Sequence, residues 1–195
     1  MTRNLYDPES CSWYRLKLDI SDAVIPGVIE SLESNQDMHI WQLEPQQILK
    51  PDWSAALPHT ATSVLLFKRS ADRADSAAHI DSAHRDIWTH LPASINWCLG
   101  PDLKSMQWWR PRSQHTSMTM TAPSGLPGDH LVWSLSDLDL IDQCIIGNTP
   151  TLVRIDQPHS IAQGQGQRIC VSVRMAAWAV EWPKIIGRFA DLIQL

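Results

Sequence analysis

Alternating apolar and polar positions mark several segments of the chain as β-strands. Residues 12–20 alternate in this way and predict a strand with one wet face, suited to the edge of a sheet. Residues 62–68 form a short apolar run that predicts a strand, and a polar turn over residues 70–76 follows it. Residues 168–175 alternate again, which places both Arg168 and Arg174 on one face of one strand.

Two apolar runs in the middle of the chain predict a β-hairpin. Residues 94–99 and 106–110 flank Gly100-Pro101-Asp102, which is a good turn sequence.

Residues 111–129 hold several Pro and Gly without clear periodicity and predict a long loop or a poorly regular strand. Long ordered loops of this kind often act as lids.

Helical spacing of apolar residues occurs in three places. Residues 23–33 follow a possible N-cap at Ser21-Asp22 and predict a short helix. Residues 136–146 carry a capping-box-like start and a glycine just beyond their end, which predicts an internal helix. Residues 183–195 form an apolar stripe that predicts a final helix on the outside of a sheet.

The order of these elements is mainly strands with flanking helices, without βαβ alternation or an internal repeat. An antiparallel double-stranded β-helix, that is, a jelly roll of the cupin-like type, fits this order. The length of 195 residues suits one compact domain, so we expect a single jelly-roll domain over residues 1–195.

Composition narrows the expected environment and partners. The net charge of -5 gives no general attraction to polyphosphate, so we expect no nucleic-acid partner. No apolar run approaches the roughly 20 residues that span a bilayer, so we expect no membrane span. The cysteines form no C-x-x-C pair, and the polar start of the chain shows no signal-peptide pattern. We therefore expect a cytoplasmic protein with reduced thiols at Cys11, Cys98, Cys144 and Cys170.

The candidate chemistry starts with His79 and Asp81. One residue separates them, so an extended backbone directs both side chains to the same face, as two ligands of one ion require. His159 is a candidate third ligand, because it precedes a strand that would lie beside the first in a closed sandwich. Two imidazoles and one carboxylate form the facial triad that binds Fe(II) for oxygen chemistry.

Each ligand taken alone has an ordinary structural explanation. An H-x-D triplet is more often a coincidence than a metal site, and a lone histidine near a strand is more often a hydrogen-bonded structural residue. His84 lies near enough to Asp81 to compete as a ligand.

Arg168 adds a reason to expect an anionic ligand. An arginine on an interior-facing strand position near a metal would be an unpaired buried charge, unless a carboxylate ligand forms a bidentate pair with it. The alternative is a partly exposed ion pair with a nearby Asp or Glu. Arg174 is a second candidate for the same role.

Taken together, these residues resemble a known superfamily. His79-Ile80-Asp81, the distal His159, Arg168 nine positions later and Ser172 on the same strand face resemble the Fe(II)/2-oxoglutarate-dependent oxygenases over residues 62–175. The segment PHSIAQGQGQRICVSVR looks most like the aspartyl/asparaginyl β-hydroxylase and prolyl-hydroxylase-like branches.

The resemblance implies Fe(II) on the triad and 2-oxoglutarate chelating the iron, with its far carboxylate on Arg168. Many members have Arg-x-Ser where this chain has Arg168-Ile-Cys170, so the hydroxyl contact either moves to Ser172 or is absent. The presence of Asp81 speaks against the halogenating members, in which a small residue admits the halide.

The function we expect is therefore a non-haem iron dioxygenase that uses O2 and hydroxylates an unactivated C–H bond of a small molecule, amino acid or peptide. Asn96 and Trp108 are candidates for the surroundings of the site, with core packing as the alternative for Trp108. Arg110 is a candidate contact for an anionic substrate, with a solvated basic turn as the alternative. A related desaturation or ring closure is the alternative to hydroxylation. Neither the choice among these reactions, nor the substrate, nor the oligomeric state follows from the sequence.

Two other classes of protein fit part of the pattern. A cupin-like metal-dependent hydrolase or isomerase would use the same three ligands but would have no use for Arg168. A non-catalytic jelly-roll module would use its tryptophans as stacking platforms and would need no metal.

Overall fold

The structure is a computed structural model. It describes residues 11–20, 23–25, 27, 40–69, 77–81, 92–99, 105–113, 118–121, 129–162, 168–176 and 180–194.

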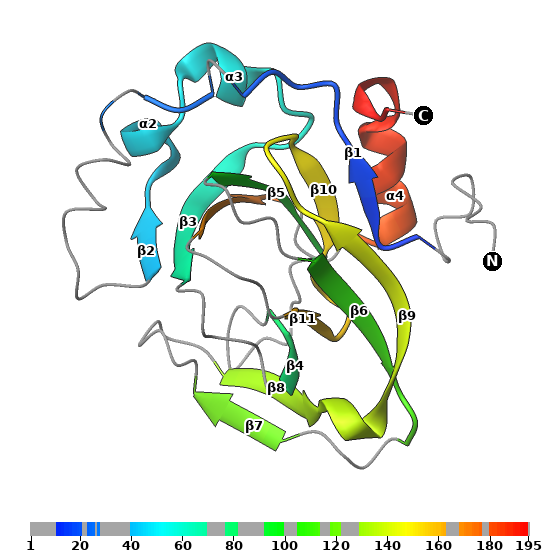
Figure 1. Ribbon diagram of the computed structural model, residues 1–195. Coiled ribbons are helices and arrows are strands. Elements are labelled where there is room, and N and C mark those ends of the chain that lie inside the picture. The colour runs from blue at the N-terminus through cyan, green and yellow to red at the C-terminus, as the bar shows by residue number, and fades with distance from the viewer. Residues whose placement is uncertain are drawn as a thin grey trace.

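The chain forms two antiparallel six-stranded sheets that make two layers (Figure 1). The first sheet holds, in order across the sheet, β1 (Trp13–Arg15), β10 (Thr151–Arg154), β5 (Ala93–Leu99), β12 (Arg168–Met175), β3 (Ala61–Arg69) and β2 (Ile40–Leu43). The second holds β7 (Met118–Thr121), β8 (Asp129–Ser134), β4 (Ala77–Ile80), β11 (His159–Ile161), β6 (Ser105–Pro111) and β9 (Leu138–Ile145). The expected mainly-β fold with few helices is confirmed.

From β3 to β6, and again from β10 to β12, successive strands alternate between the two layers. The chain passes from β3 in the first sheet to β4 in the second, then to β5 and β6, and later from β10 through β11 to β12 in the same alternating way. This alternation is jelly-roll-like. Its consequence is that β4 and β11, which are distant in sequence, become neighbours in the second sheet.

Helices cover the outer face of the first sheet. They are α2 (Pro45–Ile48), α3 (Pro51–Ala55) and α4 (Trp182–Arg188), followed by the 3-10 turn η2 (Ala190–Leu192). Apolar side chains of these helices, such as Trp53, Ile185 and Phe189, share one buried cluster with Trp97 of β5 and Val171 of β12. The predicted outer helix at the C-terminal end is therefore confirmed. Among the described residues, no helix is long and apolar enough to cross a membrane.

A second apolar cluster lies between the sheets. Cys98 and Cys170 of the first sheet pack there with Met106 and Trp108 of the second. The inner faces of β5 and β12 also carry buried polar residues. The space between the layers is therefore apolar at one end and polar at the other.

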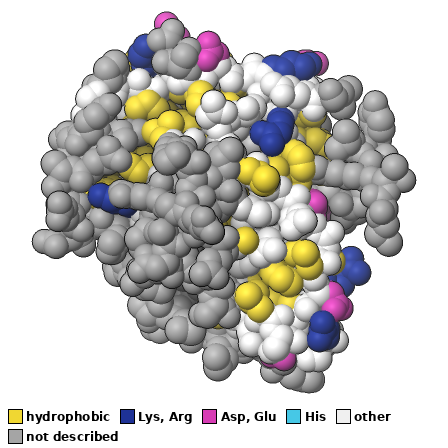
Figure 2. All heavy atoms as spheres, in the orientation of Figure 1, with side chains coloured by type: hydrophobic (Ala, Val, Ile, Leu, Met, Phe, Trp, Pro, Cys, Tyr) yellow, Lys and Arg dark blue, Asp and Glu magenta, His cyan; other side chains and the backbone are white. Residues whose placement is uncertain are grey.

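The predicted helix over residues 136–146 is wrong. These residues form the 3-10 turn η1 (Leu135–Asp137) and the edge strand β9, which pairs with β6 along its whole length. Long-range pairing overrides a helical spacing that is only a local preference. Leu140, Ile141 and Ile145 remain exposed on β9, so the spacing of the apolar residues does not mark a buried helical face. Apolar side chains show on this side of the molecule in Figure 2.

The predicted hairpin over residues 94–110 has the right strands and the wrong pairing. β5 pairs with β10 and β12 in the first sheet, whereas β6 pairs with β11 and β9 in the second. Local turn chemistry predicts that the chain turns between two strands, but it does not tell whether they stay in one sheet.

Other expectations hold in part. The strand over residues 12–20 is shorter than expected, but β1 does lie at a sheet edge. Most of the predicted helix over residues 23–33 lies outside the described residues, and within it Val24 forms an isolated β-bridge with Leu49. The predicted long loop contains β7, and its remaining residues between 114 and 128 lie outside the described part.

Candidate metal centre

Antiparallel pairing of β4 and β11 brings two histidines face to face. His79 lies directly opposite His159 in the register, so both side chains leave the same face of the sheet. Their ring centroids lie 4.6 Å apart. Ala78 and Ile80, which alternate with His79 along β4, pack in a different apolar cluster with Trp133. The pleat therefore separates the candidate ligands from the packing residues.

Asp81 completes the group immediately after β4. Its Oδ1 atom lies 3.3 Å from Nε2 of His79 and 3.8 Å from Nε2 of His159. One ligand atom from each of the three residues lies within 4.8 Å of the others, so the group could hold a metal ion. The structure thus brings together the three residues that the sequence proposed as ligands, whereas their binding of metal stays a prediction.

The surroundings of His159 favour the neutral form of its ring, which is the form that binds a metal ion. It is buried, and its Nδ1 lies 2.9 Å from the backbone oxygen of Gln157. A carbonyl only accepts hydrogen bonds, so this contact places the proton on Nδ1 and leaves the lone pair of Nε2 toward the group. Burial, and then the nearby His79, lower the pKa of His159 to about 4. Between neutral pH and this pKa, the ring therefore stays mainly neutral and binds metal without first losing a proton.

Arg174 of β12 reaches across from the first sheet to Asp81. Its Nη2 donates to Oδ2 of Asp81 at 2.6 Å, which leaves Oδ1 facing the two histidines. Burial alone would raise the pKa of Asp81, but the Arg174 guanidinium and the two histidines outweigh it and hold this pKa well below its usual range. The carboxylate is therefore ionised and oriented with one oxygen toward the candidate metal position.

The remaining donors of Arg174 have no partner among the described residues. Its Nε and Nη1 atoms are buried without a hydrogen bond, and the same is true of the hydroxyl of Ser172, two residues earlier on the same strand face. Buried donors of this kind are rare in folded proteins, because each costs about 1–3 kcal/mol when it is left unsatisfied. A carboxylate is the ligand that a planar guanidinium fits best.

Polar residues of β5 lie beside these donors. Ser94 is opposite Arg174 and Asn96 is opposite Ser172 in the register. Ser94 donates from its hydroxyl to Oδ1 of Asn96 at 2.9 Å. All four residues are buried, so they form a polar row between the layers that leads away from the metal group.

Arg168 is farther from the metal group than Arg174. The structure describes its backbone, which lies opposite Arg69 at the start of β12. Arg174 is six positions farther along the strand, which corresponds to about 20 Å between the two Cα atoms. Among the described side chains, Arg174 is the arginine at the candidate ligands. Which of the two arginines contacts a co-substrate carboxylate stays a prediction.

The two candidate substrate contacts have different surroundings. Trp108 is entirely buried in the cluster between the sheets, and its indole Nε1 donates to the backbone oxygen of Arg154 at 2.7 Å. This burial fits the core-packing alternative for Trp108, and a contact with substrate stays a prediction. Arg110 is exposed on β6, which fits either a solvated position or a contact with substrate.

Some features of the site carry no recognisable sequence signal. The contact that orients His159 comes from the backbone oxygen of Gln157, and a carbonyl has no residue type to detect. Ser94 could have been found, because Ser94 and Asn96 alternate with apolar residues on one predicted strand. The ion pair between Asp81 and Arg174 joins two sheets and follows only from the topology.

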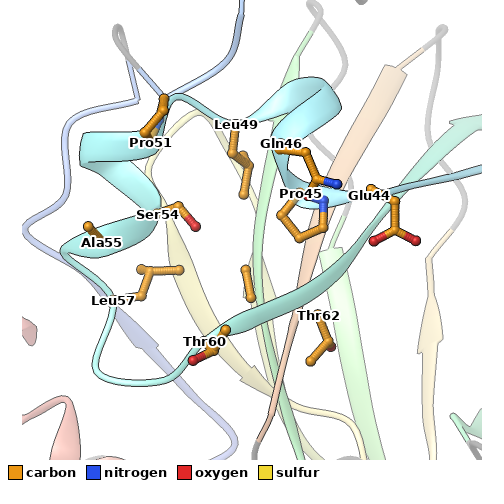
Figure 3. A pocket seen from close by; sticks show the side chains of 11 residues that line it. Glu44, Pro45, Gln46, Leu49, Pro51, Ser54, Ala55, Leu57, Thr60 and Thr62 are labelled. Carbon is orange, nitrogen blue, oxygen red and sulfur yellow. The ribbon is translucent and has the colours of Figure 1, made fainter.

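Other candidate sites offer less. His84 lies outside the described residues. His59 stacks on Phe189 at a ring distance of 6.2 Å and lies beside Arg188, apart from the metal group. A hollow between α2, α3 and the start of β3 is lined by residues such as Pro45, Leu57 and Thr60, with Glu44 as its one carboxylate (Figure 3). That hollow therefore offers no set of metal ligands.

The described residues thus provide an ionised carboxylate and two imidazoles, with spare donors for an anion beside them. Three protein ligands leave positions on a metal open for other molecules. No model of a known protein family matches the sequence, and a search of curated proteins found no match either.

Proposed function

We propose that the protein is an Fe(II)- and 2-oxoglutarate-dependent oxygenase that hydroxylates an unactivated C–H bond of a small molecule, amino acid or peptide. His79, Asp81 and His159 would hold the iron. One observation carries the proposal: buried Arg174 contacts the candidate metal-ligating carboxylate and still has two donors without a partner among the described residues.

The ligand set supports iron of the non-haem type. Two imidazoles and one carboxylate that leave open positions are the set associated with Fe(II) oxygenases. Arg174 occupies one oxygen of Asp81, which favours monodentate binding through the other. Bound there, the iron would supply the oxygen chemistry, coupled to decarboxylation of 2-oxoglutarate to succinate.

The donors beside Asp81 support an oxo acid as the second ligand. In this proposal an acid bound at the metal would accept hydrogen bonds from Nε and Nη1 of Arg174 and from the hydroxyl of Ser172, which have no partner among the described residues. We assign Arg174 to the carboxylate nearest the metal. Arg168 stays the candidate from the sequence for the far carboxylate.

The protein's contribution in this proposal is binding, orientation and exclusion of water. His159 is 4% exposed and Arg174 is 5% exposed, so the hydrogen bond of His159 and the charge of Arg174 act in a poorly hydrated interior. Neutral His159 binds the metal through Nε2 without first releasing a proton. Ionised Asp81 brings the one negative charge of the ligand set.

The test is oxygen-dependent formation of succinate from 2-oxoglutarate. Purified protein with Fe(II) and O2 would be incubated with pools of amino acids, peptides and small metabolites, and succinate would be measured against a blank without protein. We expect at least one pool to raise succinate formation in the wild type and in Arg188→Gln, a surface variant far from the group. His79→Ala and His159→Ala should abolish that increase.

Succinate formation that persists in both histidine variants would contradict the proposal. So would the absence of an increase in every pool, if a metal-loaded sample of the same protein converted another substrate class without 2-oxoglutarate. The second outcome would favour the cupin-like hydrolase or isomerase.

A further inference from the structure

Two cysteines lie directly opposite each other on neighbouring strands in the interior. Cys98 of β5 is the register partner of Cys170 of β12. Both are buried, with exposed fractions of 1% and 7%, and both belong to the apolar cluster between the sheets. Neither is part of a disulfide in this structure.

The backbone hydrogen bonds show which kind of antiparallel pair this is. The backbone N–H of Cys98 donates to the oxygen of Gly147, and the oxygen of Pro92 accepts from Ile155, so the even-numbered residues of β5 direct their backbone groups toward the β10 side. They therefore do not exchange hydrogen bonds with β12. Cys98 and Cys170 form a non-hydrogen-bonded pair, in which the Cα atoms lie about 4.5 Å apart and the side chains come closest.

This geometry lies within the range that a disulfide requires. Bridged cysteines have Cα atoms about 4.4–6.8 Å apart, so the pair sits at the short end of that range. A bridge between these two sulfurs therefore needs no separation or approach of the two strands.

We infer that Cys98 and Cys170 form an oxidisable thiol pair, which a peroxide converts to a cross-strand disulfide. Both thiols lose a proton and together two electrons, a sulfur–sulfur bond forms, and one hydrogen peroxide is reduced to two waters. A dithiol reductant restores the two thiols. The inference does not depend on what the metal group binds.

The position of the pair gives its oxidation a consequence. Cys170 and Ser172 lie on the same face of β12, and Cys98 and Asn96 lie on the same face of β5. A bond between the sulfurs would change the packing directly beside the polar row that leads to Arg174. The pair thus forms the apolar end of the space in which we place the co-substrate.

The two remaining cysteines provide internal controls. Cys144 is buried in the same cluster, but its register partner across β6 is Met106. Cys11 is buried in the cluster on the outer face of the first sheet. Burial and cluster membership are therefore matched for Cys144, whereas the facing thiol is present only for the proposed pair.

Trypsin separates all four cysteines, which makes the test direct. Cleavage after Lys and Arg leaves Cys98 in residues 86–104, Cys170 in residues 169–174, Cys144 in residues 113–154 and Cys11 in residues 4–15. Reduced, folded protein would be treated with hydrogen peroxide, its remaining thiols alkylated, and the digest analysed by mass spectrometry before and after dithiothreitol.

We expect peptide 86–104 linked to peptide 169–174, with Cys11 and Cys144 alkylated and the link removed by dithiothreitol. Cys144→Ser should form the same link, and Cys98→Val and Cys170→Ala should each lose it. The inference is overturned if all four cysteines stay alkylated at peroxide levels that oxidise a small dithiol, or if the link involves Cys144 or Cys11. Circular dichroism before digestion shows whether each variant is folded, and either single variant suffices.

Discussion

Arg174 donates from Nη2 to Oδ2 of Asp81 at 2.6 Å, and so joins the two sheets at the point where the candidate ligands converge. The guanidinium fixes which oxygen of Asp81 faces His79 and His159. Together with the two histidines, it holds the pKa of that carboxyl well below its usual range. Several measurable consequences follow from this one ion pair and from the histidines beside it.

Removal of either histidine should abolish tight metal binding. His79→Ala and His159→Ala each leave two ligands, which is too few for the facial arrangement. Metal analysis after gel filtration should show one Fe(II) or a substitute divalent ion per chain in the wild type and almost none in the variants. His59→Ala, which removes a histidine outside the group, should keep the wild-type metal content.

Arg174→Met should weaken metal binding without removing any ligand. The substitution keeps much of the side-chain volume but releases Oδ2 of Asp81, and loss of such an orienting partner typically costs about 10- to 100-fold in metal affinity. Arg174→Lys should recover only part of the loss, since a lysine offers a point charge and no planar fork. Calorimetric titration with a divalent metal would measure both, and an unchanged dissociation constant for Arg174→Met would exclude the orienting role.

Arg168 and Arg174 should separate in their effects on the two ligands. Arg168→Ala should raise the dissociation constant for 2-oxoglutarate and leave metal affinity unchanged, because the backbone of Arg168 lies about 20 Å along the strand from that of Arg174. Arg174→Ala should weaken the binding of both. If Arg168→Ala bound 2-oxoglutarate normally, the far carboxylate would have to be held elsewhere.

The metal-free protein should lose stability as the pH falls below neutrality. The pKa of His159 is about 4 in the folded protein, against about 6.5 in the unfolded chain, so the unfolded state binds more protons between these values. This contribution to stability is complete above pH 6.5 or so and is lost toward pH 4, with a total of roughly 3 kcal/mol. The low pKa of Asp81 adds a further loss below about pH 4.

Urea unfolding in the presence of a chelator, repeated from pH 7.5 to 4.5, would measure this loss. His159→Gln should flatten the slope of unfolding free energy against pH between about 6.5 and 4. A slope identical to that of the wild type would show that His159 is not held neutral by burial.

Trp108 should matter for stability and not for substrate choice. Trp108→Ala removes a fully buried ring and the donor to the Arg154 carbonyl, and we expect a loss of about 3–5 kcal/mol in unfolding free energy. Arg110→Ala at the exposed end of the same strand should change stability by no more than about 0.5 kcal/mol. Chemical denaturation of the two variants beside the wild type would measure both effects.

The sequence predicted the positions of the strands better than it predicted which strands pair with each other. Alternation identified β12 to the residue, and a short apolar run identified β3 to within one residue at each end, because both signals are local. The partners of β5 and β6 could not be predicted, since sheet membership depends on contacts distant in sequence. The edge strand β9 was predicted as a helix from the spacing of its apolar residues. Ile141 and Ile145 are exposed in this strand, so their spacing does not indicate a buried helical face.

The same distinction between local signals and long-range contacts applies to the candidate site. His79, Asp81 and His159 could be proposed from residue type and alternation, and the pairing of β4 with β11 then brought them together. The sequence favoured Arg168 over Arg174 on spacing alone. It could not show that Arg174 faces Asp81, because that contact crosses from one sheet to the other.

The most direct test of the central claim is an anaerobic titration of the metal-free protein, first with Fe(II) and then with 2-oxoglutarate, followed by visible absorption. We predict a charge-transfer band of the Fe(II)–2-oxoglutarate chelate that saturates at one equivalent, is absent in His159→Ala, needs more 2-oxoglutarate in Arg174→Ala, and is unchanged in Arg188→Gln. A wild-type protein that binds Fe(II) and yet shows no band at saturating 2-oxoglutarate would contradict the account.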